Sequence, residues 1–117
     1  MASVGELRRG DCVFVKGRRA NGCEIKKDRP AVVISNPAAC SSAPVLQVAY
    51  ITKTYKPAPY HAILNDKRTV LCEQIATVDV HFLEWTGPRL NKSEISRLNK
   101  ALAVQLQLDK EHRMEYV

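Results

Sequence analysis

The chain has 117 residues, of which 45% are hydrophobic and 26% are charged. This length and composition suit a single globular domain, residues 1–117, and exclude a disordered chain. The formal net charge of +6 is confined to residues 1–60, where ten lysines and arginines face four acids, 10 − 4 = +6. Such one-sided basic charge favours a polyanionic partner such as nucleic acid, although many solvated surfaces are also mildly basic.

The sequence shows no signs of export or of membrane insertion. No segment approaches the roughly 20 apolar residues that a membrane-spanning helix needs. Arg8, Arg9 and Asp11 interrupt any apolar run near the first residues. The four cysteines, at positions 12, 23, 40 and 72, lack the Cys-x-x-Cys spacing of zinc and redox sites. We therefore expect a cytoplasmic protein with free thiols, in which Cys12 and Cys72 are buried as small hydrophobic residues.

Short apolar segments separated by turn residues fill the first two thirds of the chain and predict β-strands. Residues 31–34 are apolar without alternation, which indicates a central strand buried on both faces. Asn65-Asp66-Lys67 suits a hairpin turn between two short strands. The predicted strands, in chain order, are residues 11–15, 29–35, 45–52, 60–64, 69–72 and 77–82.

Residues 16–28 separate the first two predicted strands. This segment is rich in lysine and arginine and contains Gly17 and Gly22. Basic, glycine-containing segments are typical of exposed loops, and structureless loops of this length are uncommon in compact domains unless they are functional. We therefore expect an exposed, mobile loop with a functional role.

The last third of the chain changes from strand to helix periodicity. Asn91 followed by Glu94 is typical of a capping box at the start of a helix. Apolar residues then recur at steps of three and four, which places them on one helical face: Ile95, Leu98, Leu102 and Leu106. Several short strands followed by one helix favour a mainly β fold, a closed or nearly closed antiparallel barrel with a helix on one side.

Several motifs, in order between about residues 9 and 108, match those of one toxin family. The longest is Gly-x-Glu at positions 22–24, followed by Arg29-Pro30 and an apolar strand that ends at Ser35. The others are Gly10-Asp11, Ile51-Thr52, Pro59-Tyr60-His61, the block Glu73-Gln74-Ile75-Ala76-Thr77-Val78-Asp79, and the closing Gly87 with the leucines that follow it. None is decisive alone, but their shared order makes the chain resemble the MazF/PemK family of toxins.

The resemblance implies an SH3-like antiparallel β-barrel of the MazF/CcdB type with a C-terminal α-helix, assembled as a homodimer. It implies the toxin of a type II toxin–antitoxin system, an mRNA interferase that cuts single-stranded RNA at short sequences without a metal or other cofactor. In that reaction a 2′-hydroxyl attacks the adjacent phosphate and leaves 2′,3′-cyclic phosphate and 5′-hydroxyl ends. A cognate antitoxin would inhibit the enzyme by occupying the RNA groove.

By this resemblance Arg29 and Thr52 are the catalytic residues. A planar guanidinium can hold two oxygens of a phosphate that gains charge in the transition state. A threonine hydroxyl at a strand end can donate to the same phosphate or align the 2′-hydroxyl. Without the resemblance, Arg29 would pass for a solvated loop end and Thr52 for an ordinary strand residue.

A larger set of residues is expected to bind RNA, with the basic loop as a flexible lid over the groove. Lysines suit phosphates, and the acids and the glutamine suit base edges or the orientation of Arg29. The alternative for Glu24 and the lysines is a solvated surface side chain, and for Gln74 and Glu73 it is a hydrogen bond to backbone within the fold. The set consists of Glu24, Lys26, Lys27, Lys53, Lys56, Glu73 and Gln74.

The chain departs from the family pattern at three positions. Lys53 stands where many members have a small polar residue, Ala76 replaces a frequent basic residue, and Leu71 stands where some members have the arginine of an Arg-x-Asp acid–base pair. That acid–base scheme is therefore not carried over. His61 is a possible proton carrier, because histidine titrates near neutral pH, but a structural role is the more common one for such a residue.

Two other functions remain open at this point. CcdB-like toxins share the barrel and inhibit DNA gyrase, but they depend on a Trp-Gly pair near the C-terminus, and this chain ends Met114-Glu115-Tyr116-Val117. The departures from the family pattern also permit a catalytically inactive module that only binds RNA or an antitoxin. Loss of RNA cleavage on Arg29→Ala would separate the enzyme from the binding module.

Overall fold

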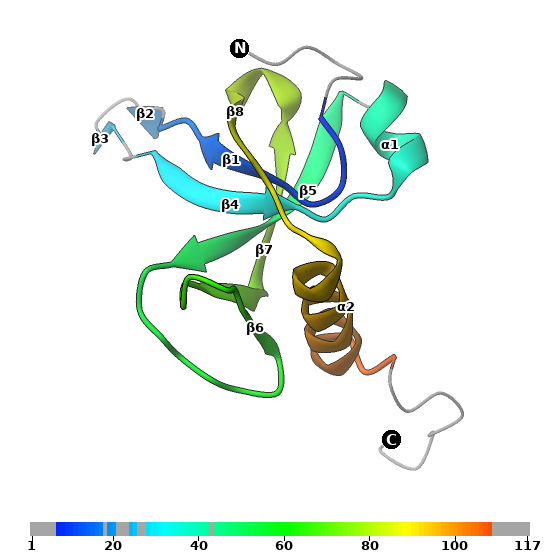
Figure 1. The fold of residues 1–117 in the computed structure, drawn as a ribbon. Coiled ribbons are helices and arrows are strands. Elements are labelled where there is room, and N and C mark those ends of the chain that lie inside the picture. The colour runs from blue at the N-terminus through cyan, green and yellow to red at the C-terminus, as the bar shows by residue number, and fades with distance from the viewer. Residues whose placement is uncertain (1–6, 18, 21–23, 26–27, 43, 109–117) are drawn as a thin grey trace, which may run out of the picture.

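The computed structural model describes residues 7–17, 19–20, 24–25, 28–42 and 44–108. Six strands form one antiparallel sheet in the order β6-β7-β5-β4-β1-β8 (Figure 1). The strands of this sheet are β1 (Asp11–Val15), β4 (Arg29–Val33), β5 (Val45–Thr52), β6 (His61–Ile63), β7 (Thr69–Asp79) and β8 (Leu83–Arg89). Helix α1 (Pro37–Ser42) joins β4 to β5, and helix α2 (Lys92–Gln105) follows β8.

The predicted fold class is confirmed, because the described part of the chain is mainly β with a C-terminal helix. The predicted strands 11–15 and 45–52 coincide with β1 and β5. Among the described residues, β6 and β8 are the two edges of the sheet and do not pair with each other. The sheet therefore curls without closing into a hydrogen-bonded barrel.

Strand β4 is buried on both faces, as its apolar run predicts. Ala31, Val32 and Val33 are fully buried, and alternate side chains enter two different core clusters. The first cluster, here called the helix-side core, comprises Cys12, Val32, Ala49, Ile51, Ala62, Leu64, Val70, Cys72, Leu90, Leu98, Ala101 and Leu102. The second, the open-side core, comprises Leu7, Val13, Val15, Ala31, Val33, Cys40, Leu46, Val48, Val78, Val80 and Leu83.

Helix α2 packs beside β6 and β7 and contributes Leu98, Ala101 and Leu102 to the helix-side core (Figure 1). Its start is the predicted capping box: the Asn91 side chain accepts from the Glu94 backbone N–H, and the Glu94 side chain accepts from the Asn91 N–H. Leu98 and Leu102 are buried as predicted, but Leu106 follows the last helical residue and is 54% exposed.

Gly10 explains the Gly-Asp motif in structural terms. Its φ of +95° lies in the left-handed region, which side chains with a Cβ rarely adopt. A Cβ at this position would also come within 2.9 Å of the Ile95 side chain on α2. Glycine therefore lets the start of β1 pass close to the helix.

The two strands predicted for residues 69–72 and 77–82 were wrong in their division. A single strand, β7, runs through both, and residues 80–82 form a 3-10 turn instead of strand. The Asp79 side chain accepts from the His81 backbone N–H and so caps that turn. Strand β7 stays continuous across the polar residues Glu73 and Gln74 because it bulges there.

Helix α1 and strand β8 were not predicted. All β8 residues after Leu83 are exposed, so an alternating pattern could not mark this edge strand. The predicted hairpin turn at residues 65–67 is confirmed between β6 and β7, with Lys67 in the left-handed region at φ 74°. Cys12, Cys40 and Cys72 are buried free thiols, which confirms the prediction for Cys12 and Cys72. No helix among the described residues is long and apolar enough to cross a membrane.

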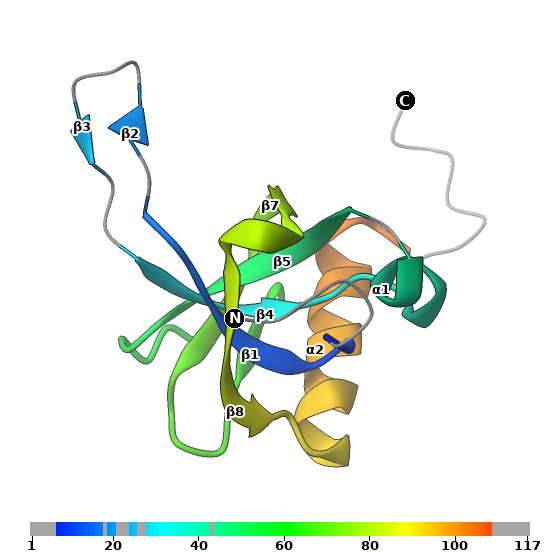
Figure 2. The same cartoon turned by 90° about the horizontal axis from the view of Figure 1, so that it is seen from above.

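The predicted loop at residues 16–28 contains two short paired strands, β2 (Arg19–Ala20) and β3 (Glu24–Ile25). Figure 2 shows that this two-stranded ribbon projects away from the body of the sheet. Asp28 closes its base by accepting from the Gly17 backbone N–H at 2.6 Å and from Lys16 Nζ at 3.2 Å. The segment is thus a hairpin that leads directly into Arg29, the first residue of β4.

Candidate functional site

Arg29 lies at the exposed start of β4 with its guanidinium held by two contacts. Its Nη2 donates a hydrogen bond to Gln74 Oε1 at 3.1 Å. Its Cζ atom lies 3.8 Å from the centroid of the Tyr50 ring, well inside the range of a cation–π interaction. The three side chains come from β4, β7 and β5, so the sheet itself assembles this cluster.

Thr52 reaches the same end of the sheet as Arg29. Strands β4 and β5 pair with Ala31 opposite Tyr50, and two further residues in each direction bring Arg29 and Thr52 to the same register position. Strand alternation also places both on the open-side face, because Ala31 and Val48 belong to the open-side core. Thr52 Oγ1 accepts from the Thr54 backbone N–H at 3.2 Å, and that bond does not use the hydroxyl proton.

The bulge in β7 brings Glu73 and Gln74 to this face. Ala49 pairs with Ile75, but the next residue, Tyr50, pairs with Leu71. Strand β5 therefore advances one residue while β7 advances four, and residues 72–74 lie outside the ladder. Glu73 and Gln74 are exposed as a result, whereas Cys72 points into the helix-side core.

His61 on β6 pairs with Glu73 on β7, so the pair lies two to three strands away from Arg29 on β4. The row Ala31, Tyr50, Leu71, His61 runs across four neighbouring strands. Because neighbouring strands lie about 4.8 Å apart, Tyr50 and His61 are roughly 10 Å apart along it. His61 Nε2 lies 2.9 Å from Glu73 Oε1, and the His61 side chain is only 5% exposed.

Both ring nitrogens of His61 face acceptors. Nδ1 lies 2.7 Å from the Lys56 carbonyl oxygen, and Nε2 faces the Glu73 carboxylate. An imidazolium, which donates from both nitrogens, satisfies the two contacts at once. Partial burial tends to raise the pKa of Glu73, but hydrogen bonds from its own backbone N–H and from His61, together with the charges of His61 and Lys56, outweigh it and lower that pKa.

The segment after β5 carries the exposed residues Lys53 and Lys56 and is tied to the sheet. Thr69, which is fully buried, donates from Oγ1 to the Thr54 carbonyl at 2.9 Å and accepts from the Lys56 N–H at 3.0 Å. The contact of the Lys56 carbonyl with His61 adds a third tie. These ties hold the two lysines at the margin of the Arg29–Thr52 face.

Three of the predicted site residues cannot be placed by their side chains. Glu24 is described only as a backbone position in β3, and Lys26 and Lys27 lie outside the described residues. Their expected RNA contacts therefore remain predictions. Within the described ranges, no three histidine, cysteine, aspartate or glutamate side chains come together as a metal-binding group.

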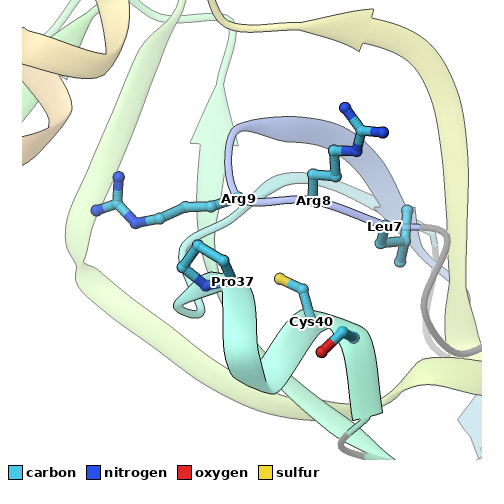
Figure 3. A pocket seen from close by; sticks show the side chains of 6 residues that line it. Leu7, Arg8, Arg9, Pro37 and Cys40 are labelled. Atoms are coloured by element: carbon cyan, nitrogen blue, oxygen red, sulfur yellow. The ribbon is translucent and has the colours of Figure 1, made fainter.

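A hollow of about 400 Å³ lies elsewhere, between the residues before β1 and helix α1 (Figure 3). Figure 3 shows the Arg8 and Arg9 side chains extending away from Cys40, and Arg9 Nε donates to the Ile34 carbonyl at 3.1 Å. The residues that line this hollow are Leu7, Arg8, Arg9, Pro37, Cys40 and Ser41. None of them belongs to the cluster around Arg29, so this hollow is separate from the candidate site.

The family model of PemK-like, MazF-like toxins of type II toxin–antitoxin systems matches residues 8–106. The chain belongs to this family. Comparison with curated protein sequences gives no match.

Solved structures of MazF proteins share the fold of this family member. The MazE–MazF complex (Form-II) from Deinococcus radiodurans has a TM-score of 0.74 at 19% identity, covering 92% of this chain and 99% of that one. An endoribonuclease in complex with its cognate antitoxin, from a mycobacterial species, has a TM-score of 0.72 at 19% identity, covering 87% and 96%. The Mycobacterium tuberculosis toxin MazF-mt6 has a TM-score of 0.58 at 22% identity, covering 72% and 91%.

Sequence analysis of this MazF-like chain missed Tyr50. A tyrosine inside a strand is usually a packing residue, so its type gave no signal. The strand period does give one, because Tyr50 lies two residues before Thr52 and so shares its face. Only the β4–β5 register places that face under Arg29.

Proposed function

We propose that this chain is the toxin of a type II toxin–antitoxin system and acts as a metal-independent endoribonuclease on single-stranded mRNA. The observation that carries the proposal is the shared register position of Arg29 and Thr52 on the open-side face. Membership of the MazF-like toxin family supports the same function. No cofactor takes part in the proposed reaction.

In the proposed reaction the 2′-oxygen of one nucleotide attacks its own 3′-phosphorus while the bond from phosphorus to the 5′-oxygen of the next nucleotide breaks. The 2′-oxygen loses a proton and the departing 5′-oxygen gains one, so the products are a 2′,3′-cyclic phosphate and a 5′-hydroxyl. Negative charge grows on the non-bridging oxygens in the transition state. A fixed guanidinium lowers the barrier because it binds this charge more tightly than that of the ground state.

Each residue has a proposed role in that reaction. Arg29 binds the non-bridging oxygens, and Thr52 donates its hydroxyl proton to the phosphate or aligns the 2′-hydroxyl. Lys53 and Lys56 contact flanking phosphates, and Glu73 and Gln74 contact base edges beside the scissile bond. Glu24, Lys26 and Lys27 are expected to add contacts from the β2–β3 hairpin.

His61 is the candidate proton carrier, with a structural role as the competing hypothesis. To accept a proton, His61 must be neutral, and its unprotonated ring nitrogen must leave its contact with Glu73 or the Lys56 carbonyl, because both ring nitrogens face acceptors. That geometry supports a clamp that holds the lysine-bearing segment. A pH–rate profile that keeps its shape in His61→Gln would assign His61 to the clamp.

The proposed partners follow from the family. We expect a homodimer in the cytoplasm, inhibited by a cognate antitoxin that occupies the RNA-binding face. Antitoxin complexes among structures of the same fold support this expectation. Size-exclusion chromatography with light scattering measures the oligomeric state directly.

The deciding experiment maps the RNA ends made by purified wild-type protein on a long single-stranded RNA in the presence of EDTA. We expect cyclic-phosphate and 5′-hydroxyl ends at one recurring short sequence, and no cuts with Arg29→Ala. Intact RNA with the wild-type protein would reject the nuclease. An RNA-binding assay and a gyrase supercoiling assay would then separate the binding module from the CcdB-like inhibitor.

A further inference from the structure

We propose that Tyr50 is a positioning residue whose ring holds the Arg29 guanidinium in the orientation needed to meet the scissile phosphate. The inference rests on the proposed function for its consequence in cleavage. It rests on the contacts of Arg29 for its physical basis. Tyr50 itself touches no RNA atom in this proposal and acts through Arg29.

The sheet fixes the Tyr50 ring before Arg29 is considered. Tyr50 pairs with Ala31 on one side and with Leu71 on the other, so its backbone is held by two strands. Its side chain is half-buried and packs against the open-side core. The ring is therefore a rigid surface and not a mobile side chain at the rim.

Arg29 meets this ring because of strand geometry. It lies two residues before Ala31 on β4, which makes it the diagonal cross-strand neighbour of Tyr50 on the same face. Ala31 has only a methyl side chain, so the long Arg29 side chain can reach across it to the ring. The result is the 3.8 Å approach of Cζ to the ring centroid.

A ring beneath a guanidinium restricts the cation without consuming its hydrogen-bond donors. The ring attracts the positive charge through its π face, whereas the five N–H groups lie in the plane of the guanidinium. Gln74 Oε1 takes one Nη2 hydrogen bond and so limits rotation in that plane. Together the two contacts define both the tilt and the rotation of the group that is proposed to bind the phosphate.

Kinetics of Tyr50 variants test this role. Cleavage of a short RNA that contains the mapped site gives kcat and KM for wild type, Tyr50→Phe, Tyr50→Leu and Arg29→Ala. We expect Tyr50→Leu to lower kcat by roughly 10- to 100-fold with KM changed less than about threefold, because orientation matters most in the transition state. Tyr50→Phe keeps the ring and should restore kcat to within about threefold of wild type.

A matched control comes from a second arginine over a ring on the far edge of the sheet. Arg89 Cζ lies 5.5 Å from the Trp85 ring centroid on β8. Trp85→Leu removes that ring and should leave kcat unchanged. If Trp85→Leu lowered kcat as much as Tyr50→Leu, the effect of Tyr50 would be a general loss of ring packing, and the positioning role would be rejected.

NMR of the Arg29 side chain tests the contact without any cleavage. The ring current of Tyr50 should shift the Arg29 Nε–Hε resonance, with the shift kept in Tyr50→Phe and lost in Tyr50→Leu. An unchanged resonance in Tyr50→Leu would overturn the proposal, as would a rise in KM at constant kcat, which marks a ring that stacks on a base. If wild type left RNA intact, the proposed function would fail, and the resonance would still decide whether Tyr50 holds Arg29.

Discussion

The carboxylate of Asp11 is fully buried and binds the Arg89 guanidinium, which lies 78 positions later in the sequence. The same carboxylate accepts from the Arg8 backbone N–H at 2.7 Å. Asp11 therefore ties the start of β1 to the end of edge strand β8. The Gly10-Asp11 motif of the sequence therefore has a structural explanation that is independent of RNA.

Asp11→Ala should destabilise the fold while leaving the candidate site intact. Removing the carboxylate deletes two hydrogen bonds at a buried position, so we expect the free energy of unfolding to fall by about 1–3 kcal/mol. Urea unfolding followed by tryptophan fluorescence measures the loss. Glu84→Ala, which removes a half-exposed partner of Lys16, should leave the unfolding midpoint unchanged and serves as the control.

Arg29→Ala and Thr52→Ala should both fold normally, because both side chains lie at strand ends outside the two core clusters. Both should lose RNA cleavage, because each removes a group that is proposed to contact the reacting phosphate or the 2′-hydroxyl. We expect at least a 100-fold loss of kcat for Arg29→Ala, on the order of other lost transition-state donors. Arg29→Lys should stay poor, because lysine lacks the planar fork. Full activity in either alanine variant, with an unchanged unfolding midpoint, would remove that residue from the site.

The lowered pKa of Glu73 predicts an acid-dependent loss of stability. A carboxyl whose pKa is lower in the native state than its ordinary value of 4.5 stabilises the fold above that pH, and the contribution disappears as pH falls through the native pKa. Wild type should therefore lose more stability than Glu73→Gln between pH 5 and pH 3, as judged by urea midpoints. Equal pH slopes for the two proteins would show that the His61–Glu73 pair does not contribute.

The buried thiols should be unreactive in the native protein. Burial, followed by the neighbouring charge of Glu73, raises the pKa of Cys72 to about 12, and burial also raises the pKa of Cys12 and Cys40. Because the thiolate is the reacting form, native Cys23→Ser should show almost no reaction with a disulfide reagent at pH 8. The unfolded variant should react at all three positions, and rapid native labelling would contradict the burial.

The raised pKa of Cys72 also makes the stability of the fold depend on pH in alkaline solution. Above the ordinary thiol pKa of 9.0 the unfolded chain loses a Cys72 proton that the native chain keeps until about pH 12. Stability therefore falls as pH rises through that window. Cys72→Val, which keeps the apolar contact, should show a smaller alkaline slope of the unfolding midpoint than wild type.

The proposed metal-independent mechanism gives a simple prediction about cleavage. Because every proposed charge on the phosphate is met by side chains, EDTA should leave the cleavage rate of wild type unchanged. Strong inhibition by EDTA that is reversed by adding one divalent cation would contradict the proposed mechanism.

The sequence predicts the fold wherever the pattern is local. The apolar run of β4, the apolar segment of β5 and the capping box of α2 each specify their element from neighbouring residues. Strand β8 could not be predicted from a local pattern because all its residues after Leu83 are exposed at an edge of the sheet. The division of β7 was wrong because a bulge interrupts the period of a strand without ending it.

In the candidate site, too, local motifs predict individual residues but not how those residues are arranged. Arg29, Thr52 and Gln74 were predicted from motifs, but their mutual arrangement depends on the pairing of β4, β5 and β7, which no local pattern specifies. Tyr50 was missed for that reason. The His61–Glu73 contact likewise joins residues whose motifs gave no sign that they meet.

The bulge in β7 separates the backbone pairing of the strand from the identity of its exposed side chains. The pairs Ala49–Ile75 and Tyr50–Leu71 fix the register on each side, so residues 73 and 74 can change without shifting either ladder. Under the proposed function, in which these two residues contact base edges, point substitutions at them should change the preferred RNA sequence while β5 and β7 stay paired. A library randomised at these two positions should yield folded toxins that differ in where they cut.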